Sequence, residues 1–178
     1  MSDVVFTVDP GIHHLGVAVF CHGKLSSAGL VEASPTGGSR LLAASAALAA
    51  SETSALCADP PAICGLSAAS RAVIELPEVY QLRGQKGRQS DIRDLAVVAG
   101  AIGAVFDRLG VPVEFVEPKA WKGQIPKDVG VRQFKHILTG DETSRVLEPR
   151  KALSHNVWDA VGIGLWAAGR FGRRLYVR

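Results

Sequence analysis

The pattern of hydrophobic and polar positions predicts strands first and alternating strands and helices later. Residues 3–9 form a short apolar, β-branched run that stops at Asp9 before a Pro-Gly pair, which indicates a buried strand ending in an acid. Residues 15–21 and 24–32 alternate well enough to be two more strands, and the His22-Gly23 pair between them is typical of a tight hairpin. We expect these three strands to form an antiparallel meander.

In the second half of the chain, apolar runs typical of strands alternate with segments that have the pattern of helices. Apolar runs at 72–76 and 113–116 predict a fourth and a fifth strand, whereas 77–90 and 140–149 are polar and predicted as loops. Helical segments are predicted over 40–57, 91–109, 118–121, 129–138 and, with Ser154 as its cap, the last helix. Strands that alternate with helices imply parallel pairing through right-handed crossovers, so we expect an α/β fold.

Acidic residues stand where three of these elements begin or end. In such a sheet the first and fourth strands can be neighbours, which brings Asp9 and Glu75 side by side at the carboxyl edge. Asp159 and His155 lie near the start of the last helix. A buried carboxylate is costly unless it is paired, so these four residues are candidates for one divalent-metal site. The alternative is three unrelated acids at element ends, where acids are common.

Length, charge and cysteine content narrow the class of protein. The chain has 178 residues, a length that suits a single domain over 1–178. Its net charge of +3 is modest. Basic residues cluster in two stretches, a pattern that suits a polyanion, although ordinary solvated surface is the alternative. Three cysteines without CxxC spacing suggest neither zinc nor disulfides, so we expect a cytoplasmic protein. No leader sequence or membrane span is expected.

Several short pieces, taken in order, resemble one nuclease family. They are Val8-Asp9-Pro10-Gly11 with Gly16, Ile74-Glu75, the basic loop before 91–109, Phe115 to Lys119 leading into Trp121-Lys122, and 155–165 with Asp159-Ala160. No single piece is specific, but the ordered set covers nearly the whole chain. It resembles the RuvC-type Holliday junction resolvases of the RNase H-like nuclease superfamily.

The resemblance implies a fold and a metal site. The fold would be RNase H-like, with a five-stranded mixed sheet in the order 3-2-1-4-5 flanked by helices. The site would hold two Mg²⁺ ions, with Mn²⁺ as a possible substitute, and Asp9, Glu75 and Asp159 match the family's acids. The family commonly has Asp or His three residues before the last acid, where this chain has Asn156. We expect His155 to act as the further ligand, because imidazole binds divalent metals better than an amide, and Asn156 stays open.

The resemblance also implies an activity and a partner. A C₂ homodimer matches the two-fold symmetry of a four-way DNA junction, and its two sites would make symmetric paired nicks that leave 5′-phosphates by two-metal-ion hydrolysis. Tyr80 would stack at the junction centre, with plain packing as the alternative. The basic residues expected to contact the DNA backbone are Arg83, Lys86, Arg88, Lys119, Lys122 and Lys127.

Other functions remain as alternatives. The ATPases and kinases of the actin and sugar-kinase fold share the Asp-x-Gly hairpin but need two such domains, and this chain has room for one. A non-catalytic nucleic-acid binder would gain nothing from acids that face phosphates. A related RNase H-like nuclease that acts on RNA or on other branched DNA would use the same metal chemistry, so the sequence separates it only weakly from a junction resolvase.

Overall fold

A mixed five-stranded sheet forms the centre of the computed structural model, which describes residues 3–33, 40–50, 66, 69–77 and 89–172. The strands are β1 (Val4–Asp9), β2 (His14–Cys21), β3 (Lys24–Glu32), β4 (Arg71–Glu75) and β5 (Val113–Val116). Their order is β3-β2-β1-β4-β5, which confirms the order that the family resemblance implies. The β1–β2 and β2–β3 pairs are antiparallel, whereas β1–β4 and β4–β5 are parallel.

The hairpin between β2 and β3 turns within two residues. His22 and Gly23 both have positive φ, 50° and 74°. Two consecutive residues in this region form the kind of tight turn that matches the twist of an antiparallel pair. The prediction of a meander that turns at His22-Gly23 is therefore confirmed.

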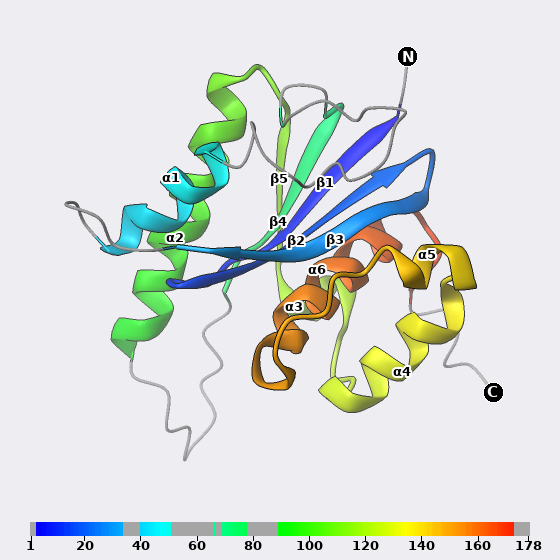
Figure 1. Cartoon of the computed structure of the whole chain (residues 1–178). Coiled ribbons are helices and arrows are strands. Elements are labelled where there is room, and N and C mark those ends of the chain that lie inside the picture. The colour runs from blue at the N-terminus through cyan, green and yellow to red at the C-terminus, as the bar shows by residue number, and fades with distance from the viewer. Residues whose placement is uncertain (1–2, 34–39, 51–65, 67–68, 78–88, 173–178) are drawn as a thin grey trace.

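Helices cover both faces of the sheet (Figure 1). They are α1 (Arg40–Ala50), α2 (Gln89–Arg108), α3 (Pro118–Trp121), α4 (Lys127–Ile137), α5 (Gly140–Ser144) and α6 (Ser154–Ala167). Helices α1 and α2 lie against one face and α3 to α6 against the other, so the sheet separates two apolar cores (Figure 1). None of the helices in the described ranges combines the length and the apolar character needed to cross a membrane.

Two local predictions on the α6 side are wrong. The stretch predicted as a polar loop over 140–149 contains helix α5, which begins with a capping box between Thr139 and Glu142. Ser154 does not cap α6, because it is the first residue of that helix and its hydroxyl donates to the Lys151 carbonyl at 3.0 Å. The part of the helix predicted over 40–57 that follows Ala50 lies outside the described residues.

Helix α6 packs on the sheet at unusually short range. A Cβ on Gly16 of β2 would lie 1.8 Å from the Asn156 carbonyl oxygen, and one on Gly164 would lie 1.9 Å from the Phe20 ring. On the neighbouring strand β1, the buried hydroxyl of Thr7 donates to the Ala160 carbonyl at 2.8 Å. Glycine contacts and one buried hydrogen bond therefore hold α6 against β1 and β2 along most of its length.

A buried ion pair ties the β3 end of this layer together. The Glu142 carboxylate accepts from the backbone N–H groups of Leu25 (2.8 Å) and Thr139 (2.9 Å), and Arg170 donates to both of its oxygens. The hydrogen bond from Arg170 is the main cause that lowers the pKa of Glu142 to about 2. Three separate segments of the chain thus meet at one charged side chain.

Candidate active site

Three carboxylates meet at the carboxyl ends of the two central strands. Asp9 is the last residue of β1, and Glu75 is the last residue of β4, directly after the paired residues Val8 and Ile74. Asp159 lies in the second turn of α6, which the contact between Thr7 and Ala160 holds beside β1. The predicted convergence of strands one and four with the last helix is therefore present, although the convergence alone does not test what the residues do.

A lysine sits between two of the acids. The Lys122 ammonium nitrogen lies 3.5 Å from Oε2 of Glu75 and 3.4 Å from Oδ2 of Asp159. The side chains of Lys122, Glu75 and Asp159 are only 20%, 14% and 10% exposed, so water screens their charges weakly. The neighbouring Trp121 donates its indole N–H to the same Glu75 oxygen at 2.7 Å, and Lys122 lies 4.6 Å from the centre of the Trp121 ring.

Within the described ranges, the ionised forms of Asp9 and Glu75 are unfavourable in the folded chain. Burial raises the pKa of Asp9 well above its usual range, and the charges of Glu75 and Asp159 add to the effect, while Lys122 and Lys127 oppose it. Burial also raises the pKa of Glu75. For Lys122, burial alone would lower the pKa, but the negative charges of Asp159, Glu75 and Asp9 outweigh it and the net pKa is raised. The site therefore favours binding of additional positive charge.

The oxygen atoms of the three acids are of the chemical type that binds a hard divalent cation. Carboxylate oxygens are the ligands that Mg²⁺ prefers, and three of them with excess negative charge attract such an ion. As the side chains stand, no three His, Cys, Asp or Glu residues within the described ranges converge closely enough to hold a metal ion. Glu75 and Asp159 are instead joined through the Lys122 ammonium.

His155 and Asn156 occupy the first turn of α6. His155 is half-buried and lies four residues before Asp159, but no contact between its imidazole and the three acids is found among the described residues. The Asn156 side chain donates from Nδ2 to the backbone carbonyl of His14 at 3.1 Å. The amide thus has a structural partner on β2, whereas the role predicted for His155 stays a prediction.

The residues predicted to bind nucleic acid fall into three groups. Lys122 belongs to the acidic centre, and Lys127, the exposed first residue of α4, lies close enough to lower the pKa of Asp9. Lys119 is exposed on α3 next to this edge of the sheet. The remaining predicted contacts lie outside the described residues, namely Tyr80, Arg83, Lys86 and Arg88.

Two features of the centre were not predicted. Trp121 is buried, and its polar edge contacts Glu75. Lys122 was interpreted as a phosphate contact and not as a partner of the acids. A signal for the first was available, because a buried indole N–H nearly always finds an acceptor. Its acceptor is 46 residues away in the chain, so no local pattern identifies it.

Comparison with known proteins concerns the fold. No protein-family model matches the chain, and no curated protein matches its sequence. Among solved structures, Thermus thermophilus RuvC in complex with a Holliday junction substrate matches with a TM-score of 0.60, 20% identity, and coverage of 95% of this chain and 98% of that chain. The chain has the RuvC fold. A second RuvC structure from the same organism gives a TM-score of 0.55 at 20% identity, over 94% of this chain and 98% of that one.

The RuvC likeness agrees with the observed sheet. Its coverage of nearly all of both chains means that the likeness includes the strand order β3-β2-β1-β4-β5 and the helices on both faces. At 20% identity the likeness to RuvC shows the fold alone. Any activity of this chain has to be argued from its own residues.

Proposed function

We propose that the chain is a metal-dependent endodeoxyribonuclease that resolves four-way DNA junctions by symmetric paired nicks. The observation that carries the proposal is the meeting of Asp9, Glu75 and Asp159 around Lys122 at the carboxyl edge of a RuvC fold. The first RuvC structure has a Holliday junction substrate bound, which supports the same class of substrate here.

The chain's residues have separate roles in this proposal. Asp9, Glu75 and Asp159 would hold Mg²⁺ or Mn²⁺, with His155 as a further ligand. When bound, two such ions would supply charge stabilisation to the attacked phosphodiester and to the leaving oxygen. Asp9 ends β1, the central strand, and the charges of both Glu75 and Asp159 act on it, so it would take part in holding either ion.

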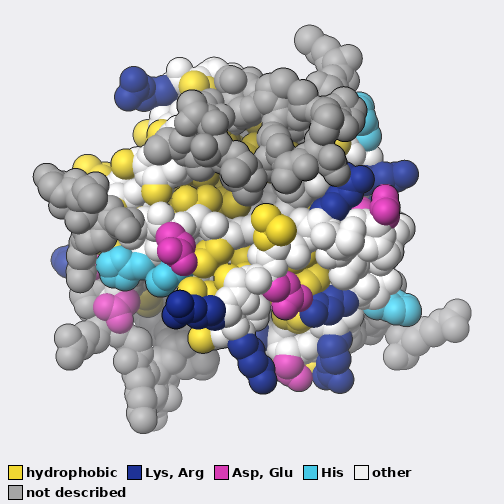
Figure 2. All heavy atoms as spheres, viewed as in Figure 1, with side chains coloured by type: hydrophobic (Ala, Val, Ile, Leu, Met, Phe, Trp, Pro, Cys, Tyr) yellow, Lys and Arg dark blue, Asp and Glu magenta, His cyan; other side chains and the backbone are white. Residues whose placement is uncertain are grey.

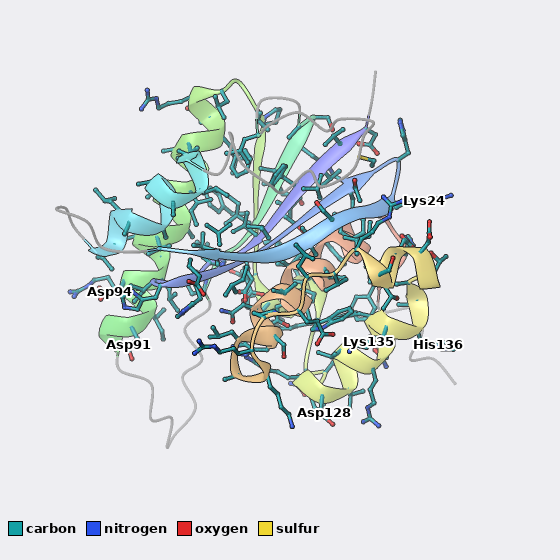
Figure 3. All side chains as sticks on the ribbon, viewed as in Figure 1. Lys24, Asp91, Asp94, Asp128, Lys135 and His136 are labelled. Atoms are coloured by element: carbon teal, nitrogen blue, oxygen red, sulfur yellow. The ribbon has the colours of Figure 1, made fainter. Side chains whose placement is uncertain are left out.

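Basic side chains beside the acids would bind the DNA backbone. Lys119 and Lys127 are exposed on α3 and α4 near the site, and Arg132 and Lys135 follow along α4. Figure 2 shows Lys and Arg side chains, with acids among them, on the face that α4 contributes. Figure 3 places Lys135 and His136 on α4, away from Asp91 and Asp94 at the start of α2. Backbone contacts by several lysines would make binding weaken steeply with salt. The proposed contacts of Tyr80 and of the loop arginines rest on the sequence alone.

A second copy of the chain would complete a junction enzyme. Val97 of α2 and Phe115 of the edge strand β5 are large apolar side chains exposed on the α2 and β5 side of the sheet. The small residues of α2 fall on two sides: Ala99 and Gly103 are buried, whereas Gly100 is exposed and an added Cβ there would meet no atom within 4 Å. Exposed apolar and small side chains beside an edge strand support a homodimer contact here. A cytoplasmic location stays a prediction.

A nicking assay with Mg²⁺ tests the proposal. It compares a labelled four-way junction, a plain duplex and an RNA–DNA hybrid, with EDTA and Asp9→Asn as controls. We expect paired symmetric nicks on the junction alone, lost in both controls. Cleavage of the hybrid would keep the metal chemistry and replace the substrate by RNA. Tight junction binding without any cut would leave a binding module and reject the nuclease.

A further inference from the structure

The indole of Trp121 makes the shortest polar contact at the acidic centre. Its Nε1–H donates to Oε2 of Glu75 at 2.7 Å, a distance typical of a hydrogen bond to a charged carboxylate. We propose that Trp121 is a positioning residue, which holds one oxygen of Glu75 so that the other is directed to the bound cation. This inference rests on the proposed function, because it assigns Trp121 a task in the same metal site.

Trp121 is itself held in one place. Its side chain is buried, and a Cβ on Gly162 of α6 would lie 2.5 Å from its ring. The Phe134 ring lies on another side, 6.2 Å between centroids. Pro118 begins the short helix α3 that carries Trp121, directly after β5, and β5 pairs with the strand that ends at Glu75. A donor fixed by packing loses little freedom when it holds a carboxylate, which is what a positioning role requires.

The two oxygens of Glu75 have different surroundings. Oε2 accepts from Trp121 and lies 3.5 Å from Lys122, whereas no donor reaches Oε1 within the described part of the chain. A carboxylate that is tethered at one oxygen keeps the other oxygen for a further partner. Residues that hydrogen-bond a metal ligand in this way commonly change metal affinity 10–100-fold when they are removed.

The molecule contains a second constellation of the same composition, which serves as an internal control. Trp158 donates its indole N–H to Glu148 Oε1 at 3.1 Å, and Lys135 contacts the same oxygen at 2.9 Å while lying 4.8 Å from the Trp158 ring. Glu148 is 45% exposed and contacts none of the three acids among the described residues. Trp158 also directly precedes Asp159, so a change there reports any general disturbance of α6.

Binding of Mn²⁺ to metal-free protein, measured by calorimetry, tests the role without measuring catalysis. Trp121→Phe removes the donor and keeps an aromatic ring, and Trp158→Phe does the same in the control constellation. We expect Trp121→Phe to weaken Mn²⁺ binding about tenfold and Trp158→Phe to change it less than twofold. Thermal unfolding followed by far-ultraviolet circular dichroism checks that both variants are folded at the temperature of the titration.

A second measurement needs no change in the residue under test. The indole ¹H–¹⁵N signal of Trp121, identified by its loss in Trp121→Phe, should move when Mg²⁺ is added to the unmodified chain, and the Trp158 signal should not. In Glu75→Gln the Trp121 signal should move without any metal. These shifts report the hydrogen bond directly, even if a variant folds poorly.

The outcomes separate two failures. If the unmodified chain binds Mn²⁺ but Trp121→Phe binds it equally well, or Trp158→Phe loses as much, the positioning role is wrong and the proposed function stands. A Trp121 signal that ignores Mg²⁺ has the same meaning. If the unmodified chain neither binds Mn²⁺ nor cuts a junction, the proposed function is rejected, and the role of Trp121 with it.

Discussion

Removing the Lys122 ammonium should destabilise the metal-free protein strongly. Lys122 lies 3.5 Å from Glu75 and 3.4 Å from Asp159, and each contact is worth about 5 kcal/mol at an effective dielectric constant of about 20. The two contacts together give about 10 kcal/mol of attraction. The desolvation of a buried ammonium costs several kcal/mol and, with screening by the remaining water, offsets most of this attraction. We therefore expect Lys122→Met to cost about 3 kcal/mol of unfolding free energy, the range found when one partner of a buried pair is removed.

Urea unfolding in EDTA at pH 8 measures this cost. For a chain of this length about 3 kcal/mol corresponds to a fall in Tm of roughly 6–12 °C. The matched control is Lys135→Met, because Lys135 also contacts a glutamate and lies over a tryptophan ring, but its partner Glu148 is exposed. An exposed pair contributes about 1 kcal/mol or less, so the control should lose much less stability.

The loss in Lys122→Met should depend on pH and on metal. The raised pKa of Lys122 means that its stabilisation is present at all pH values below its usual pKa and is lost only in strong base. Burial raises the pKa of Glu75 and Asp9, so both accept protons as the pH falls, and the loss should be smaller at pH 5 than at pH 8. Added Mg²⁺ should restore much of the stability. A loss no larger than in Lys135→Met, or one that Mg²⁺ leaves unchanged, would refute the charge-compensation reasoning.

Three further predictions concern single residues. Glu142→Gln should cost about 2–3 kcal/mol of unfolding free energy at neutral pH, because the pKa of Glu142 in the folded chain is lowered to about 2. This stabilisation is present above pH 4.5 and is lost as the pH falls towards 2. Urea unfolding should therefore show a smaller stability difference between the variant and the unmodified chain at pH 3 than at pH 7. Asp9→Asn should abolish junction cleavage yet raise the Tm of the metal-free protein, because the buried charge is unfavourable in the fold; a lower Tm in EDTA would contradict this. His155→Ala should weaken Mn²⁺ binding measured by calorimetry more than Asn156→Ala does, and the reverse order would make Asn156 the ligand.

The strands and the neighbouring positions of Asp9 and Glu75 were predictable because they follow from local patterns, whereas the full strand order came from the family resemblance. Asp9 and Glu75 each close an apolar run, and the alternation of strands with helices places such ends at one edge. Helix α5 was missed, although Thr139 followed three residues later by Glu142 is a capping-box signature. The apolar run that usually follows this signature is absent, so the polar composition of the stretch predicts a loop.

The contacts of Lys122 and Trp121 with the acids, which offset part of their negative charge, were not predictable from local sequence. Lys122 and Trp121 are adjacent in the chain, but their partner Glu75 is on another strand, and only the pairing of β4 with β5 brings them together. A lysine near acids and a lysine near phosphates look the same in a sequence. Only the position of the ammonium, within a few ångströms, separates the two roles. That position depends on the direction in which the chain runs from β5 into α3.

The glycines at the contacts of α6 have a consequence for mutational scanning of this chain. Gly16, Gly162 and Gly164 admit no side chain, since an added Cβ would overlap a carbonyl or an aromatic ring. In a library of all single substitutions selected for activity, we expect these glycines to tolerate as few replacements as the three acids do. A folding reporter would separate the two sets, because glycine variants should lose folded protein whereas Asp9→Asn should keep it. Intolerance at these glycines therefore marks the surface on which the site is assembled, and it should not be taken for chemistry.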